Sequence, residues 1–322
     1  MQFISRKQVE QVLSPSACLQ LSRDAFALLS QGKVKQTLRS VIASEQGSLM
    51  GTMPACIEEG PYAGFGLKTV KVDFSRHAQS TSHEGCILLY DASEKGDLVV
   101  VDAASVTELR TAAASALATD ILAPPGATRL AILGTGVQAR KHAQMMMEIR
   151  PLQHISVWGR SEARASVFAE WCQQQLGLSA TVAMTPAQAV AEADIICTVT
   201  AAKVPFLHCR DLPAQCHINA VGASAPGFQE IDSDIYATVA LYVDDREAVW
   251  HASTCLLEAK QQGLIPQEYW GTEIGERLTS DVQPTSLRLQ RTLFKSVGLA
   301  VQDLVFARAV VAQTPLSIHP TL

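Results

Sequence analysis

The chain has 322 residues, of which 48% are hydrophobic and 18% charged, and its formal net charge is −5. Such a length accommodates about two domains of the usual size, and the apolar fraction is that of an ordinary core-forming protein. The acidic balance offers no basic field for a phosphate backbone, so nucleic acid is excluded as the expected partner.

Neither a membrane partner nor secretion is expected. No apolar run reaches the length of a membrane span, and the N-terminus lacks the apolar core of a signal peptide. The eight cysteines form no C-x-x-C pair, and several lie in apolar runs, as small core residues of a reducing cytoplasm do. Cys209 and Cys216 lie near His208 and His217 but lack a second paired ligand set, so no metal site is predicted.

The N-terminal part changes its pattern near residue 39. Residues 1–35 read as two helical segments, the second beginning at Ser14-Pro15-Ser16 and ending at Gly32. Short strands separated by turn residues follow up to about Val101, which predicts a mainly antiparallel sheet. An Ala-rich helix is then predicted over 106–122, and Pro124-Pro125-Gly126 ends it and marks a domain boundary.

Beyond that boundary, strands and helices alternate, which predicts a parallel, doubly wound α/β sheet. Strands are predicted at 154–158, 180–183, 194–199, 217–221 and 240–243, the last taken as the final strand, with helices at 161–176 and 186–192. Residues 293–312 are predicted as a closing helix.

A G-x-G-x-x-A motif, Gly134 to Ala139, separates an apolar run from a helical one. Such a turn lets a pyrophosphate approach the backbone and the first helical N–H groups. The cofactor contacts expected here are Gly134, Thr135, Gly136, Val137 and Gln138. The motif alone also suits any glycine-bearing turn of an α/β protein, and the alternating strands decide in favour of a dinucleotide.

The end of the second strand indicates which nicotinamide cofactor is preferred. NAD sites usually place Asp or Glu there to bind the ribose hydroxyls. This sequence has Gly159, Arg160 and Ser161, followed by Arg164, and a guanidinium suits a 2′-phosphate. The alternative is that these arginines are solvated surface charges. NADPH is the predicted cofactor, with NADH also possible.

Several stretches together resemble one family. They are the 134–139 motif, His217–Ser224, Ser82–Gly85, Leu109–Ala114 and Phe294–Gly298. The sequence resembles the ornithine cyclodeaminase/mu-crystallin family over nearly the whole chain. The resemblance implies a homodimer, with residues 1–123 and 293–322 as an α+β substrate-binding and dimerisation domain and 124–292 as a Rossmann domain. It also implies chemistry on the imine of a small amino acid.

The same resemblance assigns the substrate site to Arg39, Lys68 and Arg110, with Arg110 also beside the cofactor. An imino carboxylate needs a bidentate cation and a proton donor near its nitrogen, which a desolvated lysine provides. Lys71 remains an alternative to Lys68. Around the nicotinamide half, the resemblance places Ser82, His83, Thr200, Val221 and Ser296.

One departure separates this chain from cyclodeaminases of the family. Their aspartate is Ser224 here, and their lysine is Phe228. A serine hydroxyl carries no charge at neutral pH, so cyclodeamination is disfavoured unless Asp232 or Asp234 substitutes.

A serine at this position resembles the ketimine reductases of the family. The sequence therefore predicts NADPH-dependent reduction of a cyclic ketimino acid, pyrroline-2-carboxylate or piperideine-2-carboxylate, to L-proline or L-pipecolate. Lys68 is the expected proton donor, Arg39 and Arg110 the carboxylate clamp, and Ser224 an orienting group. The alternatives are an ornithine cyclodeaminase, an alanine-dehydrogenase-like enzyme and a non-catalytic, NADPH-dependent binding protein.

Overall fold

The computed structural model describes residues 1–45, 48–72, 83–92, 98–279 and 291–314. The chain divides into two compact units, the first comprising residues 1–110 and the segment from Leu299 onward, the second Thr111–Gly298. The division falls within helix α3 (Ala103–Leu122) and after Gly298, whereas the sequence analysis set the limits at 123 and 293.

The first unit contains a sheet that is antiparallel except for one strand pair, as expected from the sequence. Its strands are β1 (Gln2–Ile4), β2 (Val34–Gln36), β3 (Ser40–Ala43), β4 (Leu49–Ile57), β5 (Gly64–Val72), β6 (His83–Leu89) and β7 (Val99–Asp102). The order is β1-β7-β6-β5-β4-β2, β3 also pairs with β4, and β1 runs parallel to β7. The strands β1 and β2 were missed, because the whole 1–35 segment was predicted as helical.

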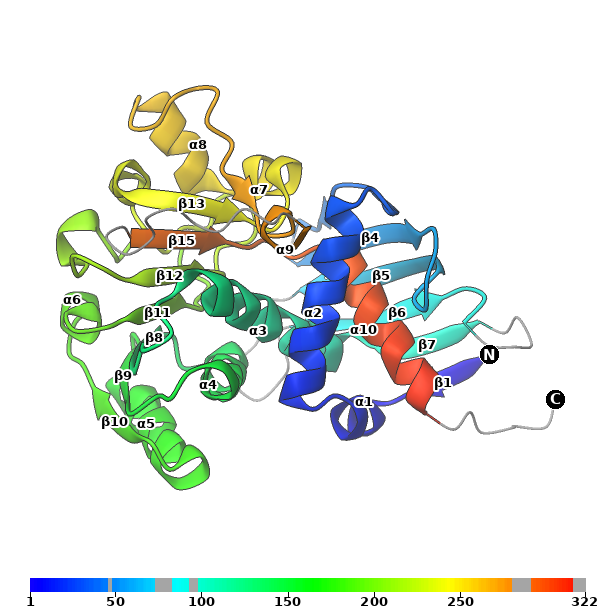
Figure 1. Ribbon diagram of the computed structural model, residues 1–322, viewed down its shortest axis with the longest axis horizontal. Helices are drawn as coiled ribbons and strands as arrows, with labels where there is room; N and C mark the ends of the chain where they lie inside the picture. The colour runs from blue at the N-terminus through cyan, green and yellow to red at the C-terminus, as the bar shows by residue number, and fades with distance from the viewer. Residues whose placement is uncertain (46–47, 73–82, 93–97, 280–290, 315–322) are drawn as a thin grey trace. The chain divides into compact units, whose positions relative to one another are not determined.

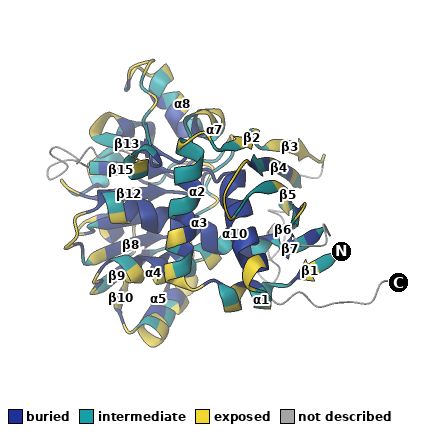
Figure 2. Cartoon of the chain, turned by 45° about the vertical axis from the view of Figure 1, so that its right-hand side comes forward, coloured by how far each residue is buried: buried dark blue, intermediate teal, exposed yellow. Residues whose placement is uncertain are grey.

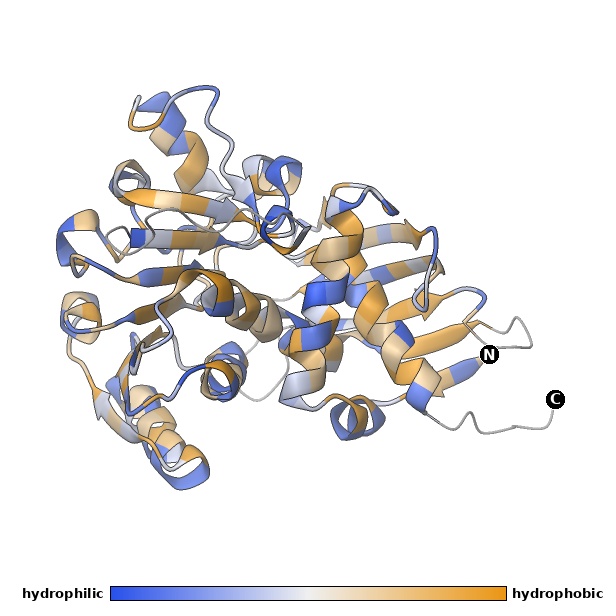
Figure 3. Cartoon of the chain, in the orientation of Figure 1, coloured by the Kyte–Doolittle hydropathy of each residue, from blue (hydrophilic) through white to orange (hydrophobic). Residues whose placement is uncertain are grey.

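Helix α10 (Ala300–Gln313) covers one face of this sheet (Figure 1) and packs against α2 (Pro15–Ser30) as well as β4, β5 and β6. Residues 300–311 are all buried, and the helix is coloured mostly hydrophobic in Figure 3. The expected start of α2 is confirmed, since Ser14 Oγ accepts a hydrogen bond from Ala17 N at 3.2 Å. The shorter helix α1 (Arg6–Val12) precedes it.

The register of β4 and β5 determines which side chains face α10. Met53 lies opposite Lys68 and both are buried, whereas Pro54 lies opposite Leu67 on the other face. Because side chains alternate between the faces of a strand, Lys68 lies on the buried face with Met53, and Lys71 lies on the outer face with Leu67 and Pro54. Lys71 is exposed, so it lies away from the buried side chains around Lys68.

The second unit is built on a sheet of parallel strands with the doubly wound order that the sequence predicted, β10-β9-β8-β11-β12-β15-β13-β14. Its strands are β8 (Arg129–Leu133), β9 (His154–Trp158), β10 (Ser179–Val182), β11 (Ile195–Thr198), β12 (His217–Ala220), β13 (Val239–Val243), β14 (Thr272–Glu273) and β15 (Arg291–Lys295). The connecting helices are α4 (Val137–Ile149), α5 (Glu162–Leu176), α6 (Pro186–Val190), α7 (Arg246–Ala252), α8 (Thr254–Gln261) and α9 (Glu276–Thr279), with 3₁₀ turns η1 (Cys209–Asp211) and η2 (Ser233–Thr238). Figure 2 shows β8 and β12 in the buried colour, while α5 carries exposed residues on its outer side.

Two predictions about the end of this sheet were wrong. Residues 240–243 are not the last strand, and 293–312 is not one helix, because β15 (Arg291–Lys295) lies between β12 and β13 in the sheet. Leu293 and Phe294 are both fully buried, since a central parallel strand is covered on both faces. Such an apolar run has no period that separates it from a buried helix. The helix begins only at Ala300, after Gly298 with φ +79°.

Within the described residues, every helix is too short or too polar to cross a membrane.

Candidate functional site

The residues expected to hold the dinucleotide follow the carboxyl ends of neighbouring parallel strands. Gly134 follows β8, Gly159 follows β9, Thr200 comes after β11, Val221 follows β12 and Ser296 follows β15. The strand order reverses between β8 and β11. In open α/β sheets this edge, at the reversal point, is where ligands bind.

The turn after β8 has the backbone geometry that a pyrophosphate needs. Gly134 has φ +136°, and a Cβ there would lie 2.8 Å from Val199 O, so a side chain is excluded. Gly136 is the N-cap of α4 without a side-chain cap, and a Cβ on it would meet nothing within 4 Å. Val137 and Gln138 begin the helix, whose first N–H groups have no intrahelical partner. The turn therefore fits an anionic cofactor group.

The loops after β8 and β9 pack against each other. A Cβ on Gly159 would lie 2.7 Å from Thr135 Cγ2, so a larger residue there would have to displace the Thr135 side chain. Arg160 and Ser161 are exposed, and Ser161 Oγ accepts from Arg164 N at 3.4 Å as the N-cap of α5. No ion pair to Arg160 is found within the described part of the chain, which leaves its guanidinium available for an anionic ligand.

Sequence reasoning missed Glu230, a buried carboxylate that ties two of these loops together. Its Oε1 accepts from Thr200 N at 2.5 Å, and its Oε2 accepts from Thr198 Oγ1 at 2.8 Å and Gly222 N at 2.8 Å. Burial raises the pKa of Glu230, and the hydrogen bond from Thr200 opposes that rise. The loops after β11 and β12 are thereby held at one carboxylate, which no local pattern around residue 230 indicates.

Asp244 performs a similar role beside Ser296. Its Oδ2 accepts from Ser296 Oγ at 2.9 Å and from the backbone N–H groups of Val297 and Gly298 at 2.8 Å. Lys295, buried in β15, donates to Ala223 O at 2.5 Å. The segment after β15 is therefore fixed by side chains that the sequence analysis did not name.

In the first unit, the structure brings Lys68 and Arg110 together through a third residue, Asp303 of α10. Lys68 Nζ and Arg110 Nε each lie 3.1 Å from the same atom, Asp303 Oδ1. All three side chains are at most 6% exposed. Asp303 was not predicted, since it lies within the apolar sequence of α10.

Burial lowers the pKa of Lys68 to about 8, and the cations Arg110 and Arg39 add to this effect, while Asp303 opposes it. Arg39 precedes β3, and its Cδ lies 3.7 Å from where a Cβ on Gly51 would stand, on the buried face of β4. A pKa in this range suits a group that exchanges a proton near the operating pH of an enzyme.

Ser82 and His83, both expected beside the nicotinamide, lie at the edge of the described part of the chain. Ser82 lies outside the described residues, and His83 is described only as the first residue of β6, paired with Val72.

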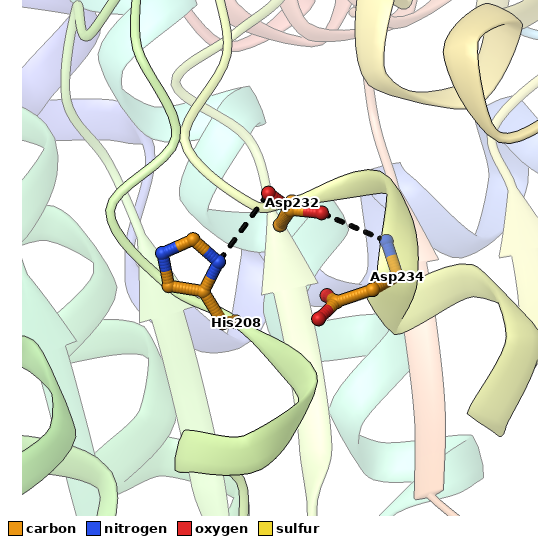
Figure 4. Close-up of side chains that lie close together, drawn as sticks. All are labelled: His208, Asp232 and Asp234. Atoms are coloured by element: carbon orange, nitrogen blue, oxygen red, sulfur yellow. Dashed lines mark hydrogen bonds and ion pairs between the residues drawn. The ribbon is translucent and has the colours of Figure 1, made fainter.

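The loop after β12 places Ser224 and Phe228 as half-buried residues. Asp232 and Asp234, the alternatives for the missing acid, lie in another cluster with His208 (Figure 4). Asp232 Oδ2 is 3.3 Å from His208 Nδ1, Asp232 Oδ1 accepts from Asp234 N at 3.0 Å, and Asp234 Oδ1 accepts from Cys209 N at 3.0 Å. These bonds join η1 to η2, so both carboxylates have structural partners.

The same three residues are the only group of potential metal ligands within the described chain, with ligand atoms within 4.8 Å of one another. The His and Cys residues considered from the sequence do not converge. His217 contacts Thr292 and Asn219, whereas Cys209 contacts Thr238 and Arg291.

Comparisons with known proteins support a single family. The model of the ornithine cyclodeaminase/mu-crystallin family matches residues 1–315. The ketimine reductase mu-crystallin of Mus musculus is 35% identical over 316 residues, with 96% of each chain covered. The resemblance predicted from the sequence is confirmed.

Two solved structures share the whole fold. The Δ(1)-pyrroline-2-carboxylate reductase of Thermococcus litoralis, in complex with NADH and L-proline, matches with a TM-score of 0.91 and 28% identity over 97% of each chain. An archaeal alanine dehydrogenase dimer with bound NAD matches with a TM-score of 0.87 and 26% identity, covering 97% of this chain and 95% of that one.

Proposed function

The chain belongs to the ornithine cyclodeaminase/mu-crystallin family, and we propose that it reduces a cyclic ketimino acid with a reduced nicotinamide cofactor. The substrate is pyrroline-2-carboxylate or piperideine-2-carboxylate, and the product L-proline or L-pipecolate. The observation that carries this proposal is the buried Lys68, paired with Arg110 through Asp303. The names of the mouse and Thermococcus relatives support the same reaction class.

The roles of the residues follow from their chemistry. Arg110 and Arg39 bind the substrate carboxylate, for which guanidinium is the matched partner. The Lys68 ammonium donates a proton to the imine nitrogen, which makes the imine carbon electrophilic. When bound, the reduced nicotinamide supplies the hydride that this carbon accepts. One hydride and one proton convert the imine to a secondary amine.

Ser224 has no acid–base role in this proposal. Its hydroxyl orients the substrate by hydrogen bonding, because it stays uncharged at neutral pH. Cyclodeamination needs a charged proton acceptor, and Asp232 and Asp234 are engaged in joining η1 to η2. This favours reduction of a preformed imine.

NADPH is the proposed cofactor because Arg160 is exposed after β9, and positions 158 to 161 at the end of this strand carry no Asp or Glu to bind ribose hydroxyls. The backbone of Gly134 to Gln138 holds the pyrophosphate, and the loops joined by Glu230 lie along the nicotinamide half.

A homodimer is proposed through the outer face of the first unit's sheet. This face carries large apolar side chains that a monomer leaves exposed to water, including Phe3 at 67% and Phe65 at 61% exposure. Exposed apolar patches of this kind mark interaction surfaces. An open groove of about 580 Å³ beside Phe65 adds further apolar surface. We expect Phe65→Glu to give a monomer by light scattering. The proposed compartment is the cytoplasm, since all eight cysteines are free thiols.

The decisive experiment follows loss of reduced-nicotinamide absorbance with each cyclic ketimine, comparing NADPH with NADH, without ammonia. Rapid oxidation with a preference for NADPH supports the proposal. Oxidation of NADH only with a keto acid and ammonia indicates alanine-dehydrogenase-like activity. Redox-neutral formation of proline from ornithine indicates a cyclodeaminase, and NADPH binding without turnover indicates a binding protein.

A further inference from the structure

Asp303 is a buried acid, and its position is explained neither by solubility at the surface nor by apolar packing in the core. It is fully buried in α10, and one of its oxygens accepts from two cations, Lys68 on β5 and Arg110 on α3, each at 3.1 Å. Removing a carboxylate from water is costly unless charged partners compensate. The two cations provide that compensation, and they are the groups assigned to the substrate.

The direction of the Arg110 bond leaves part of the guanidinium available. Arg110 donates to Asp303 through Nε, and no other hydrogen bond from Arg110 is found within the described residues. Among the described residues, the two Nη nitrogens have no acceptor and form a pair of parallel donors. Such a pair binds a carboxylate bidentately, so Asp303 orients the fork without occupying it.

Among the described residues, one anion and two cations act on the charge of Lys68. Asp303 faces it from α10, Arg110 from α3, and Arg39 from the segment before β3. Its cross-strand neighbours, Met53 and Ile87, are apolar. Without the Asp303 charge, a buried ammonium beside two guanidinium groups would release its proton more easily.

We propose that Asp303 is the positioning residue of the substrate site: one carboxylate keeps Lys68 protonated as a donor and aims the Arg110 fork at the substrate carboxylate. The inference rests on the proposed function. It assigns no contact between Asp303 and the substrate.

Asp303→Asn tests the role because it keeps the size and one carbonyl oxygen but removes the charge. We expect the alkaline limb of the kcat/KM profile to move toward lower pH by about one unit or more, the effect of losing a neighbouring opposite charge. The substrate's own ionisation is common to both proteins, so the difference reports the enzyme. The KM for the imino acid should also rise, because the Arg110 fork loses its anchor. NADPH binding, followed by fluorescence, should stay within twofold.

Glu108→Gln is the matched control. Glu108 lies on the same helix as Arg110 and forms a bidentate pair with Arg6 at 2.8 and 2.9 Å. It should leave the pH profile unchanged. A wild-type pH profile and KM in folded Asp303→Asn would overturn the proposal.

If Asp303→Asn does not fold, Asp303→Glu decides the matter. This variant retains the charge, so the alkaline limb should stay at the wild-type pH, while kcat should fall because the longer side chain displaces the carboxylate. A limb displaced to lower pH in Asp303→Glu, or failure of both variants to fold, would assign Asp303 to the fold alone.

A second readout separates this inference from the proposed function. The rate of Lys68 acylation by acetic anhydride, measured by mass spectrometry across pH, reports its protonation without any turnover. If the wild type reduces no imine but Lys68 of Asp303→Asn is acylated at lower pH, the proposed function fails and the role of Asp303 stands. If the acylation profile of Lys68 is unchanged in Asp303→Asn while the wild type reduces the imine normally, the proposed function stands and the role of Asp303 fails.

Discussion

Lys68 Nζ lies 3.1 Å from Asp303 Oδ1, although 235 residues separate the two in the chain. The contact exists because the chain returns to its first sheet through α10 after completing the second unit. Helix α10 thus contributes a side chain to this buried charge cluster as well as to the core of the first unit.

Lys68→Met should abolish imine reduction. Methionine fills a similar volume but carries no proton, and loss of a general acid costs about 10²–10⁴-fold in rate. Steady-state turnover with a cyclic ketimine measures this loss, and NADPH fluorescence shows whether the cofactor still binds. Lys71→Met, an exposed lysine on the other face of β5, should retain full activity. Intact turnover in a folded Lys68→Met protein would rule out Lys68 as the donor.

The wild-type kcat/KM should fall above pH 8. The pKa of Lys68 is lowered to about 8, mainly by burial, and the imine needs the protonated form. Activity therefore persists below this pKa and declines as pH rises through it. A pH–rate profile between pH 6 and 10 measures the midpoint. A donor with an ordinary lysine pKa would keep the enzyme active to pH 10 and contradict this assignment.

Arg160→Ala should change the cofactor preference. Loss of a charge-assisted hydrogen bond of ~1.5–3 kcal/mol to the 2′-phosphate raises the KM for NADPH about 10–100-fold. The KM for NADH should stay nearly constant, because NADH lacks this phosphate. Arg210→Ala removes an exposed arginine whose neighbour Cys209 contacts Thr238 and Arg291 at the amino ends of β13 and β15, so it should change neither value. Equal effects on both cofactors would show that Arg160 does not read the phosphate.

The parts of this protein that sequence predicts well are those with a local pattern. The Gly134–Ala139 turn, the alternating strands of the second unit and the mainly antiparallel first sheet all follow from spacing and turn residues. That Lys68 and Arg110 belong to one site was expected only through the family resemblance, because a lysine on a strand is usually exposed.

The missed features depend on contacts between distant segments. Glu230 binds Thr198 and Thr200 from a loop with no motif of its own. Asp303 lies in an apolar helix where a carboxylate has no local explanation. The strand β15 was taken for helix because it is inserted between β12 and β13, where both faces are buried and the alternation that marks a strand is lost.

Two buried histidines should make the second unit sensitive to acid. Burial lowers the pKa of His142 to about 4 and that of His217 to about 3. Both stay neutral when folded, while the unfolded chain binds protons near the ordinary pKa of about 6.5. Stability is therefore complete above about pH 6.5 and falls below it, by up to ~1.4 kcal/mol per pH unit for each histidine.

Urea unfolding of the wild type and His142→Gln at pH 7, 6 and 5 measures this effect. The variant lacks one of the two proton-binding sites, so its deficit in unfolding free energy should narrow as pH falls. The exposed residue His251 provides the control variant His251→Gln, which removes a histidine but leaves both buried ones in place. A constant deficit for His142→Gln would mean that His142 binds protons equally well in the folded and unfolded protein, and would contradict the prediction.

Glu230→Gln should weaken cofactor binding more than it weakens the fold. The carboxylate of Glu230 accepts hydrogen bonds from Thr198, Thr200 and Gly222 at once. In the glutamine variant, NH₂ replaces one of the two oxygens, and this donor faces other donors. The loops after β11 and β12 should separate, and the KM for NADPH should rise roughly tenfold, or ~1.4 kcal/mol. Glu258→Gln alters a carboxylate bonded to Gln229 at 2.5 Å and should leave that KM unchanged. Because Glu230 is buried, thermal unfolding of its variant is measured beside the KM. A lower melting temperature with an unchanged KM would show that Glu230 supports the fold without shaping the cofactor cleft.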